Sequence, residues 1–227
     1  MFVSEQNKFI FFHIPKTAGT SIHRSLKASF DQYHLDTFPP VHHIQPKEYL
    51  YFNENKKDFF KFCFVRNPYE RIVSAFLDFQ NQRNTSMYYN FQILFDYYKI
   101  NPLTTRTVYF MTGKNIEKEN FTNFNEYCEA LVKTNRENKD LLTISKSMNF
   151  TDFVKSPTFY DWVVDVHFKP QSNFILDDNG ERLVDFIGRY EDLENDLTEI
   201  SSKLNCEFKL EHIRESQKYQ YQDTYEL

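Results

Sequence analysis

Residues 8–22 read KFIFFHIPKTAGTSI and carry the strongest indication of the fold. Its first part, residues 8–13, is a short apolar run of aromatic and β-favouring residues, which is typical of a buried strand. A segment containing proline and glycine follows and would end that strand. From residue 20 onward apolar side chains recur at four-residue steps, as they do along one helical face: Ile22, Leu26 and Phe30. The stretch therefore predicts a strand, a tight loop and a helix.

A second strand, loop and helix are predicted further along the chain. Residues 61–66 (KFCFVR) form another apolar run, which the Asn67-Pro68 pair interrupts. The next stretch places four apolar side chains on one helical face: Ile72, Ala75, Phe76 and Phe79. Strands that alternate with helices are typical of a largely parallel sheet with helices on both faces. The sequence thus predicts an α/β fold.

The remaining elements follow from the same periodicities. Further helices are predicted at residues 91–98, 124–131 and 193–204. Two more strands are predicted at residues 173–176 and 184–190, joined by the turn Asp177-Asp178-Asn179-Gly180. No repeat or low-complexity linker divides the chain, so residues 1–227 are expected to form a single domain with its core at residues 8–205. The expected mobile regions are residues 133–146 and the tail at 215–227.

Composition excludes several classes of function. A formal net charge of -5 argues against a general nucleic-acid or membrane-surface binder. The three cysteines, Cys63, Cys128 and Cys206, are widely spaced without a metal-site pattern and indicate buried thiols in a reducing compartment. No apolar run approaches the ~20 residues of a membrane span, and residues 1–8 lack the apolar core of a signal peptide. We therefore expect a cytoplasmic protein with no nucleic-acid partner and no integral membrane segment.

The loop after the first predicted strand has the chemistry of an anion site. A helix N-terminus presents unpaired N–H groups, and its dipole favours negative charge. Gly19 would let a ligand approach the backbone, Thr17, Thr20 and Ser21 would add hydroxyl donors, and Lys16 would add a positive charge. The order differs from the GxxxxGK[ST] loop of nucleoside triphosphatases, because the lysine precedes the glycine. An ordinary turn that contains a glycine is the alternative interpretation.

A second candidate anion-binding pair lies in the second predicted unit. Arg66 ends the strand, where ligands collect in open parallel sheets, and Ser74 lies in the following helix. An arginine can bind a phosphate through two hydrogen bonds, and a serine hydroxyl can add a third. A surface ion pair for Arg66 and a solvated position for Ser74 are the alternatives.

Taken together, FFHIPKTAGTSI (residues 11–22) and CFVRNPYERIVSAF (residues 63–76) resemble the two donor-binding motifs of the carbohydrate-type (family 2) sulfotransferases. That family includes the heparan and chondroitin sulfotransferases and their bacterial relatives. Two later segments are also similar to family elements: HFKPQ (residues 167–171) and IGRYEDL (residues 187–193). The resemblance implies a P-loop-like sulfotransferase fold with a mostly parallel sheet flanked by helices. Residues 81–149 match no family element and are expected to recognise the acceptor.

The resemblance also implies a reaction and a donor site. The chain would transfer the sulfuryl group of 3′-phosphoadenosine 5′-phosphosulfate, a co-substrate, to a hydroxyl acceptor, implied to be a carbohydrate, without a metal. The phosphosulfate end would sit on Lys16, Thr17, Ala18, Gly19, Thr20 and Ser21. The 3′-phosphate would meet Arg66 and Ser74, and Lys16 would neutralise the charge that develops on the departing nucleotide.

A base for the acceptor hydroxyl is expected among the histidines, because imidazole titrates near neutrality. His42 and His43 lie in a segment that resembles the family's region with a catalytic histidine, and His43 aligns better through the following Gln45-Pro46-Lys47-Glu48. His43 is therefore the predicted base, with His42 and Glu48 as alternatives.

Four further residues have expected roles in or beside the site. His13 is expected to be a structural hydrogen-bonding residue. His167 would either line the site or satisfy a loop carbonyl. Arg189 and Glu191 are expected to form an internal ion pair or to contact the loop.

Two rival functions are compatible with the same residues. A P-loop-like small-molecule kinase would bind ATP with Mg²⁺, although the order of the loop residues counts against it. A non-catalytic relative would keep the nucleotide site and lack turnover.

Overall fold

The computed structural model describes residues 1–30, 43–80, 118–127, 130, 147–157, 159 and 166–206. The helix predicted at residues 91–98, both expected mobile regions, His42, Cys128 and most of the expected acceptor-recognition stretch lie outside the described residues. The described residues belong to two compact units, one from Met1–Pro68 and Pro170–Lys218 and the other from Tyr69–Lys169 and Tyr219–Leu227. The expectation of a single domain stays a prediction.

A four-stranded mixed sheet with the order β1-β2-β3-β4 lies at the centre of the first unit. The strands are β1 (Phe2–Ser4), β2 (Phe9–Phe12), β3 (Phe60–Val65) and β4 (Phe186–Arg189). Strands β2, β3 and β4 run parallel to one another, as the sequence predicts, whereas β1 pairs antiparallel with β2. Strand β1 was not predicted, because a strand of three residues shows too little alternation to identify.

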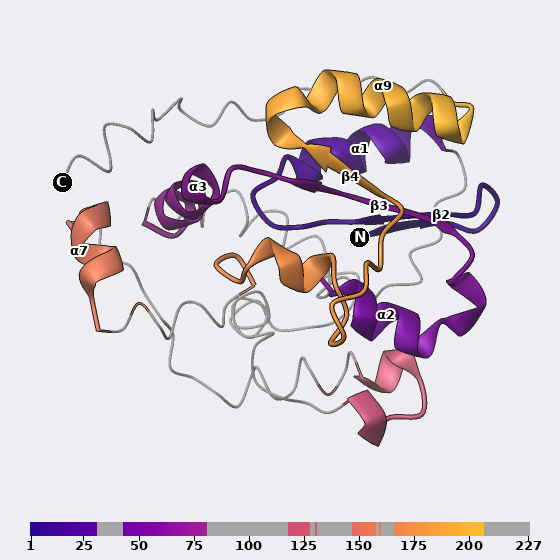
Figure 1. The fold of residues 1–227 in the computed structure, drawn as a ribbon, viewed down its shortest axis with the longest axis horizontal. Helices are drawn as coiled ribbons and strands as arrows, with labels where there is room; N and C mark the ends of the chain where they lie inside the picture. The colour runs from indigo at the N-terminus through magenta and orange to yellow at the C-terminus, as the bar shows by residue number, and fades with distance from the viewer. Residues whose placement is uncertain are drawn as a thin grey trace, which may run out of the picture. The chain divides into compact units, whose positions relative to one another are not determined.

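Helices cover both faces of this sheet. Helices α1 (Gly19–Ser29) and α9 (Leu193–Leu204) lie on one face, and α2 (Pro46–Phe52) lies on the other (Figure 1). Because both faces are covered, all four residues of β2 are buried. Both predicted helices α1 and α9 are confirmed, and their apolar faces point into the core.

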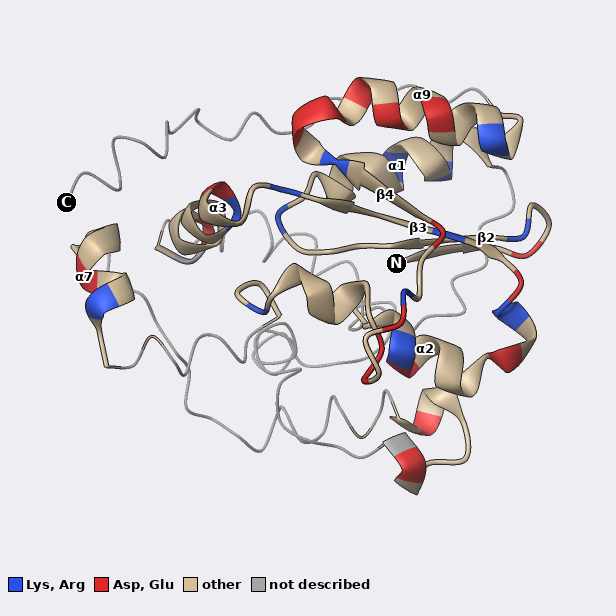
Figure 2. Ribbon diagram, viewed as in Figure 1, with Lys and Arg blue, Asp and Glu red and all other residues tan. Residues whose placement is uncertain are grey.

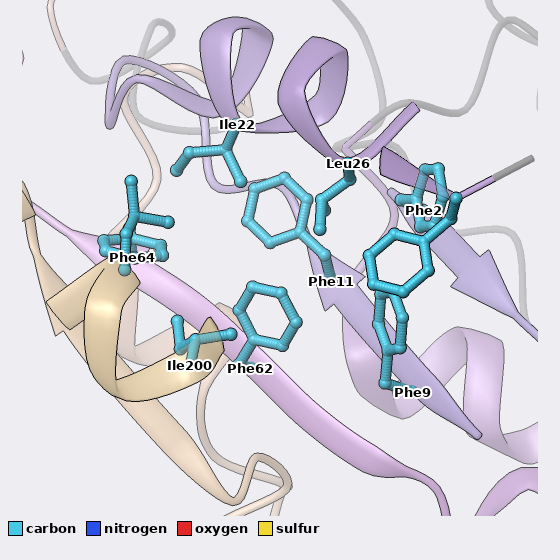
Figure 3. Close-up of a cluster of buried hydrophobic side chains, with 10 residues drawn as sticks. Phe2, Phe9, Phe11, Ile22, Leu26, Phe62, Phe64 and Ile200 are labelled. Atoms are coloured by element: carbon cyan, nitrogen blue, oxygen red, sulfur yellow. The ribbon is translucent and has the colours of Figure 1, made fainter. Parts of the chain in front are cut away.

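The core beneath α1 and α9 is built mainly from phenylalanine rings (Figure 3). Its buried members are Phe2, Phe9, Phe11, Ile22, Leu26, Phe30, Phe62, Phe64, Leu197 and Ile200. The rings of Phe11 and Phe62 on the adjacent strands stack with their centroids 5.3 Å apart. On the opposite face Phe12 meets Tyr49 of α2, with ring centroids 6.1 Å apart. Alternate side chains of β2 therefore pack into two apolar layers, one on each face of the sheet.

The segment before β4 differs from the predicted hairpin. The strand predicted at residues 173–176 is wrong, because these residues enter a 3₁₀ turn, η4 (Gln171–Phe174), which buries Phe174 completely. Only an isolated bridge, Leu176 to Arg182, pairs the two sides. The intervening turn is confirmed: the Gly180 N–H donates to the Asp177 carbonyl at 3.2 Å, and Gly180 has a φ of 82°. Two further 3₁₀ turns of this unit are η2 (Glu54–Lys56) and η5 (Tyr190–Asp192).

The second unit has its own apolar cluster. Among its described elements are α3 (Pro68–Gln80), η3 (Lys118–Asn120) and α7 (Phe150–Lys155). The buried members of the cluster are Val73, Ala75, Phe76, Phe150, Phe153 and Phe168, with Ile72 packed against them. The predicted helix after the Asn67-Pro68 pair is thus confirmed. Of the helix predicted at residues 124–131, residues 124–127 are helical and bury Phe124 and Tyr127.

Candidate functional site

Three basic residues follow or end the parallel strands. Lys16 lies in the loop after β2, Arg66 directly follows β3, and Arg189 is the last residue of β4. Because the three strands are parallel neighbours, their carboxyl ends meet at one edge of the sheet. In Figure 2 basic residues colour the loop after β2 and the end of β3. This edge is the candidate site within the first unit.

The loop after β2 adopts an unusual backbone conformation. Lys16 has a φ of 69° and Ala18 a φ of 62°, so two non-glycine residues within three positions are left-handed. Each such residue costs on the order of 1 kcal/mol or more, and strained residues of this kind gather at functional sites. Left-handed residues alternating with ordinary ones also turn successive N–H groups toward one point, which makes a concave anion site. The conformation therefore fits an anionic ligand.

The start of helix α1 adds further donors. Its first helical bonds run from the N–H groups of Ser21 and Ile22 to the Ala18 carbonyl, at 2.9 and 3.1 Å. The N–H groups of Gly19 and Thr20 precede these bonds and have no acceptor within the helix. Ala18 occupies the N-cap position without a side chain that could accept them, and no acidic residue lies in the first turn. An anion at this end would satisfy donors that the chain itself leaves open.

Two residues of the loop have structural tasks. Thr17 is fully buried, and its hydroxyl donates to the Ile14 carbonyl at 2.8 Å. Gly19 is buried against His13, because a Cβ at Gly19 would overlap the His13 imidazole. The ring of His13 thus fills the place that a Cβ at Gly19 would take, and the expected approach of a ligand to the Gly19 backbone stays a prediction. Thr20 is exposed, whereas Lys16, Ala18 and Ser21 are half-buried.

His43 contacts this loop through His13. Its Nδ1 lies 2.9 Å from the carbonyl oxygen of His13, and the two rings meet edge to face with centroids 4.4 Å apart. A carbonyl oxygen only accepts hydrogen bonds, so Nδ1 of His43 must carry the proton. The neutral ring then has its lone pair on Nε2. This contact uses the backbone carbonyl of His13, so the expected structural role of the His13 side chain stays a prediction.

Glu48, one of the alternatives for the base, has a structural contact. Its carboxylate accepts a hydrogen bond from the Gln45 N–H at 3.3 Å, and the Gln45 side chain accepts from the N–H of Glu48. This reciprocal pair is a capping box that starts α2. The carboxylate of Glu48 therefore caps the N-terminus of α2, which begins three residues after His43.

Arg66 is held by residues from two later segments. The Gln171 side chain accepts from the Arg66 N–H at 2.9 Å and donates to the Arg66 carbonyl at 2.7 Å. The guanidinium carbon of Arg66 lies 4.2 Å from the centre of the Tyr190 ring. The Asn67 N–H donates to the carboxylate of Glu191 at 2.6 Å, so Glu191 contacts the segment that follows β3. The HFKPQ and IGRYEDL segments thus meet the residue that follows β3.

Ser74 and His167 belong to the second unit. Ser74 is half-buried on α3, and His167 is buried. Arg71, which the sequence analysis did not single out, is 2% exposed and donates to the carbonyls of Lys169 at 2.9 Å and Val166 at 3.4 Å. The sequence signal that could have identified Arg71 is its place in the second motif. The structure shows that it is buried beside the HFKPQ segment.

The described part of the chain shows no cluster of three or more His, Cys, Asp or Glu side chains that could hold a metal ion. Cys63 is buried in β3, and burial raises the pKa of its thiol to about 12. A thiol with so high a pKa is a poor nucleophile. None of the helices within the described ranges has the length and apolar character that a membrane crossing requires.

The fold and the loop define an α/β protein with a candidate anion site at the carboxyl edge of its parallel strands. A model of the sulfotransferase family matches residues 1–226, so the chain belongs to the sulfotransferase family. It is therefore a transferase that moves a sulfuryl group from a sulfate donor to a hydroxyl acceptor. This membership sets aside the small-molecule kinase. No curated protein and no solved structure matches the chain.

Proposed function

We propose that this transferase takes the sulfuryl group from 3′-phosphoadenosine 5′-phosphosulfate and passes it to a carbohydrate hydroxyl, in a P-loop-like fold. The observation that carries the proposal is the loop at the end of β2, where left-handed Lys16 and Ala18 precede the open N–H groups of α1. A phosphosulfate group supplies the negative oxygens that such donors prefer. Further support comes from the resemblance of the two motifs to those that bind this donor.

The donor end of the reaction is assigned to the loop. The loop from Lys16 to Ser21 would bind the phosphosulfate, with the N–H groups of Gly19 and Thr20 as donors, and the Lys16 ammonium would neutralise charge on the departing phosphate oxygen. The bond from sulfur to that oxygen breaks while a bond from sulfur to the acceptor oxygen forms. Arg66 and Ser74 are the proposed ligands of the 3′-phosphate, by their places in the second motif.

The acceptor end is assigned to His43. Its Nδ1 proton is bound to the His13 carbonyl, so Nε2 is the atom that takes the proton of the attacking hydroxyl. Fixing Nδ1 in this way sets both the tautomer and the direction of the ring. His43 is preferred as the base over Glu48, whose carboxylate caps the N-terminus of α2.

We also propose a reducing, cytoplasmic compartment. Cys63, in the described part of the chain, is a buried free thiol. Free thiols persist where disulfides do not form readily.

The first experiment measures donor binding and turnover with one protein preparation. Calorimetry with 3′-phosphoadenosine 5′-phosphate should show binding, and a glycan panel should show release of this nucleotide from the donor. His43→Gln should keep nucleotide binding and lose most turnover, roughly a hundredfold or more. Glu48→Gln, which keeps much of the capping geometry, is the matched control and should retain turnover.

The outcomes separate the rival interpretations. A folded protein that binds neither donor nor product would rule out the proposed donor. Tight donor binding without turnover on any hydroxyl compound would favour the non-catalytic relative. A His43→Gln variant as active as the wild type would reject the base assignment while leaving the donor assignment intact.

A further inference from the structure

The contacts around Arg66 point to an additional function for the HFKPQ segment. Strand β3 ends at Val65, which pairs with Arg189 of β4, and Arg66 is the first residue beyond this ladder. A residue at that place loses the strand hydrogen bonds that would fix its backbone. Gln171 replaces them, because its amide bonds both the N–H and the carbonyl of Arg66, at 2.9 and 2.7 Å. The side-chain amide of Gln171 thus makes the two hydrogen bonds that the backbone of a neighbouring strand would otherwise make with Arg66.

Gln171 is itself well anchored. It is the first residue of η4, and Phe174 at the end of that turn is completely buried. The turn is closed by hydrogen bonds from the Asn173 N–H to the Pro170 carbonyl at 3.1 Å and from the Ile175 N–H to the Ser172 carbonyl at 3.0 Å. The amide of Gln171 is therefore presented to Arg66 from a fixed piece of backbone.

The side chain of Arg66 has a second support. Its guanidinium carbon lies 4.2 Å above the Tyr190 ring, a distance at which cation and ring attract each other. The next residue is fixed as well, since the Asn67 N–H donates to Glu191. A guanidinium stacked on a ring keeps its edge N–H groups directed outward, which suits recognition of a phosphate.

We propose that Gln171 and Tyr190 are positioning residues that hold Arg66 ready for the 3′-phosphate of the donor. Gln171 fixes the backbone and Tyr190 fixes the guanidinium, so less side-chain freedom is lost when the nucleotide binds. This inference rests on the proposed function, because it assumes that Arg66 meets the 3′-phosphate. It assigns to both residues an effect on nucleotide selectivity rather than on the chemical step.

The test compares two nucleotides that differ only in the group Arg66 would bind. Calorimetry gives Kd values for 3′-phosphoadenosine 5′-phosphate and for adenosine 5′-phosphate, which lacks the 3′-phosphate. The wild type should prefer the bisphosphate. Gln171→Leu should weaken bisphosphate binding about tenfold and leave adenosine 5′-phosphate binding unchanged, so that the preference shrinks by the same factor. Ser172→Ala, an exposed position on the same turn, is the matched control and should bind both nucleotides as the wild type does.

The Tyr190 variants provide an independent measurement should Gln171→Leu not fold. Tyr190→Phe keeps the ring and should keep the preference, whereas Tyr190→Leu should reduce it several-fold. The steady-state readout should agree, with a raised KM for the donor and an unchanged kcat in Gln171→Leu.

Each possible result bears on a different assumption. A wild type that binds both nucleotides equally would refute the role of Arg66 in the proposed function. A clear wild-type preference that survives both Gln171→Leu and Tyr190→Leu would overturn the inference alone. Equal weakening of both nucleotides in either variant would show general damage to the unit and would also overturn it.

Discussion

Replacing Gly19 by alanine should push the His13 ring out of its place and destabilise the first unit. A Cβ at Gly19 would overlap the imidazole of His13, and even the ring carbon nearest the backbone would lie only 2.5 Å away. Because that carbon is close to the main chain, a small rotation of the ring tip cannot relieve the overlap. The ring has to swing away, and it would then leave its edge-to-face contact with His43.

The expected change in the free energy of unfolding follows from two opposing effects. Forcing an extra methyl group into a filled site costs about 1–3 kcal/mol. Alanine is the better helix former by up to about 1 kcal/mol, although less than this is gained in the first turn of α1. We therefore expect Gly19→Ala to lower the free energy of unfolding by about 1–2 kcal/mol. In a His13→Ala background the space is open, and the same change should be neutral or slightly stabilising.

The assay is a double-mutant cycle followed by urea unfolding at constant pH. The coupling between Gly19→Ala and His13→Ala should be about 2 kcal/mol, with the double variant more stable than the sum of the single changes. Gly180→Ala is the control: Gly180 has a φ of 82° and nothing within 4 Å of an added Cβ, so its cost should be the same in both backgrounds. The reasoning is refuted if Gly19→Ala unfolds like the wild type, or if its cost does not depend on His13.

Two further predictions concern charge. Lys16→Met should lower kcat roughly a hundredfold with little change in the donor KM if the ammonium stabilises the departing nucleotide; a rise in KM alone would limit Lys16 to binding. Burial, followed by nearby positive charges, lowers the pKa of His23 from 6.5 to about 4, so the unfolded chain binds more protons than the folded one between these values. Stability should therefore fall as the pH drops from about 6.5 to about 4. The loss should be about 2 kcal/mol, because partial exposure of the ring reduces the full value of about 3 kcal/mol. His23→Phe should remove most of this dependence in urea unfolding measured across the range, and an unchanged profile would contradict the assignment.

Local patterns in the sequence predicted the elements that bring the site together. The apolar runs at β2 and β3 and the helical periodicities after them were sufficient, because both faces of the sheet are covered: β2 is continuously apolar, and Lys61 is the one polar residue of β3. The parallel arrangement followed from the alternation of strands and helices. The strand predicted at positions 173–176 was wrong, since periodicity in a short apolar run does not distinguish a strand from a 3₁₀ turn.

Helix α2 was also absent from the prediction. Its sequence, PKEYLYF, places proline first and glutamate third, which are start signals that favour a helix. The short length of seven residues leaves fewer than two turns of periodicity to detect. Its buried side chains, Tyr49 among them, pack on the sheet face opposite α1.

The sequence by itself determined which residues could bind an anion, since Lys16 and Arg66 follow strands, and Gly19 begins a helix, that local periodicity locates. Only the tertiary structure decided how they are supported. The His13 carbonyl that fixes the His43 tautomer is 30 residues from His43, and the amide that holds Arg66 is 105 residues away. Periodicity reports which side chains share a face of one element, whereas these contacts depend on where the chain returns after folding. The loop's own glycine shows the same limit, because its lack of a Cβ leaves room for the ring of His13, a contact that no pattern along the sequence indicates.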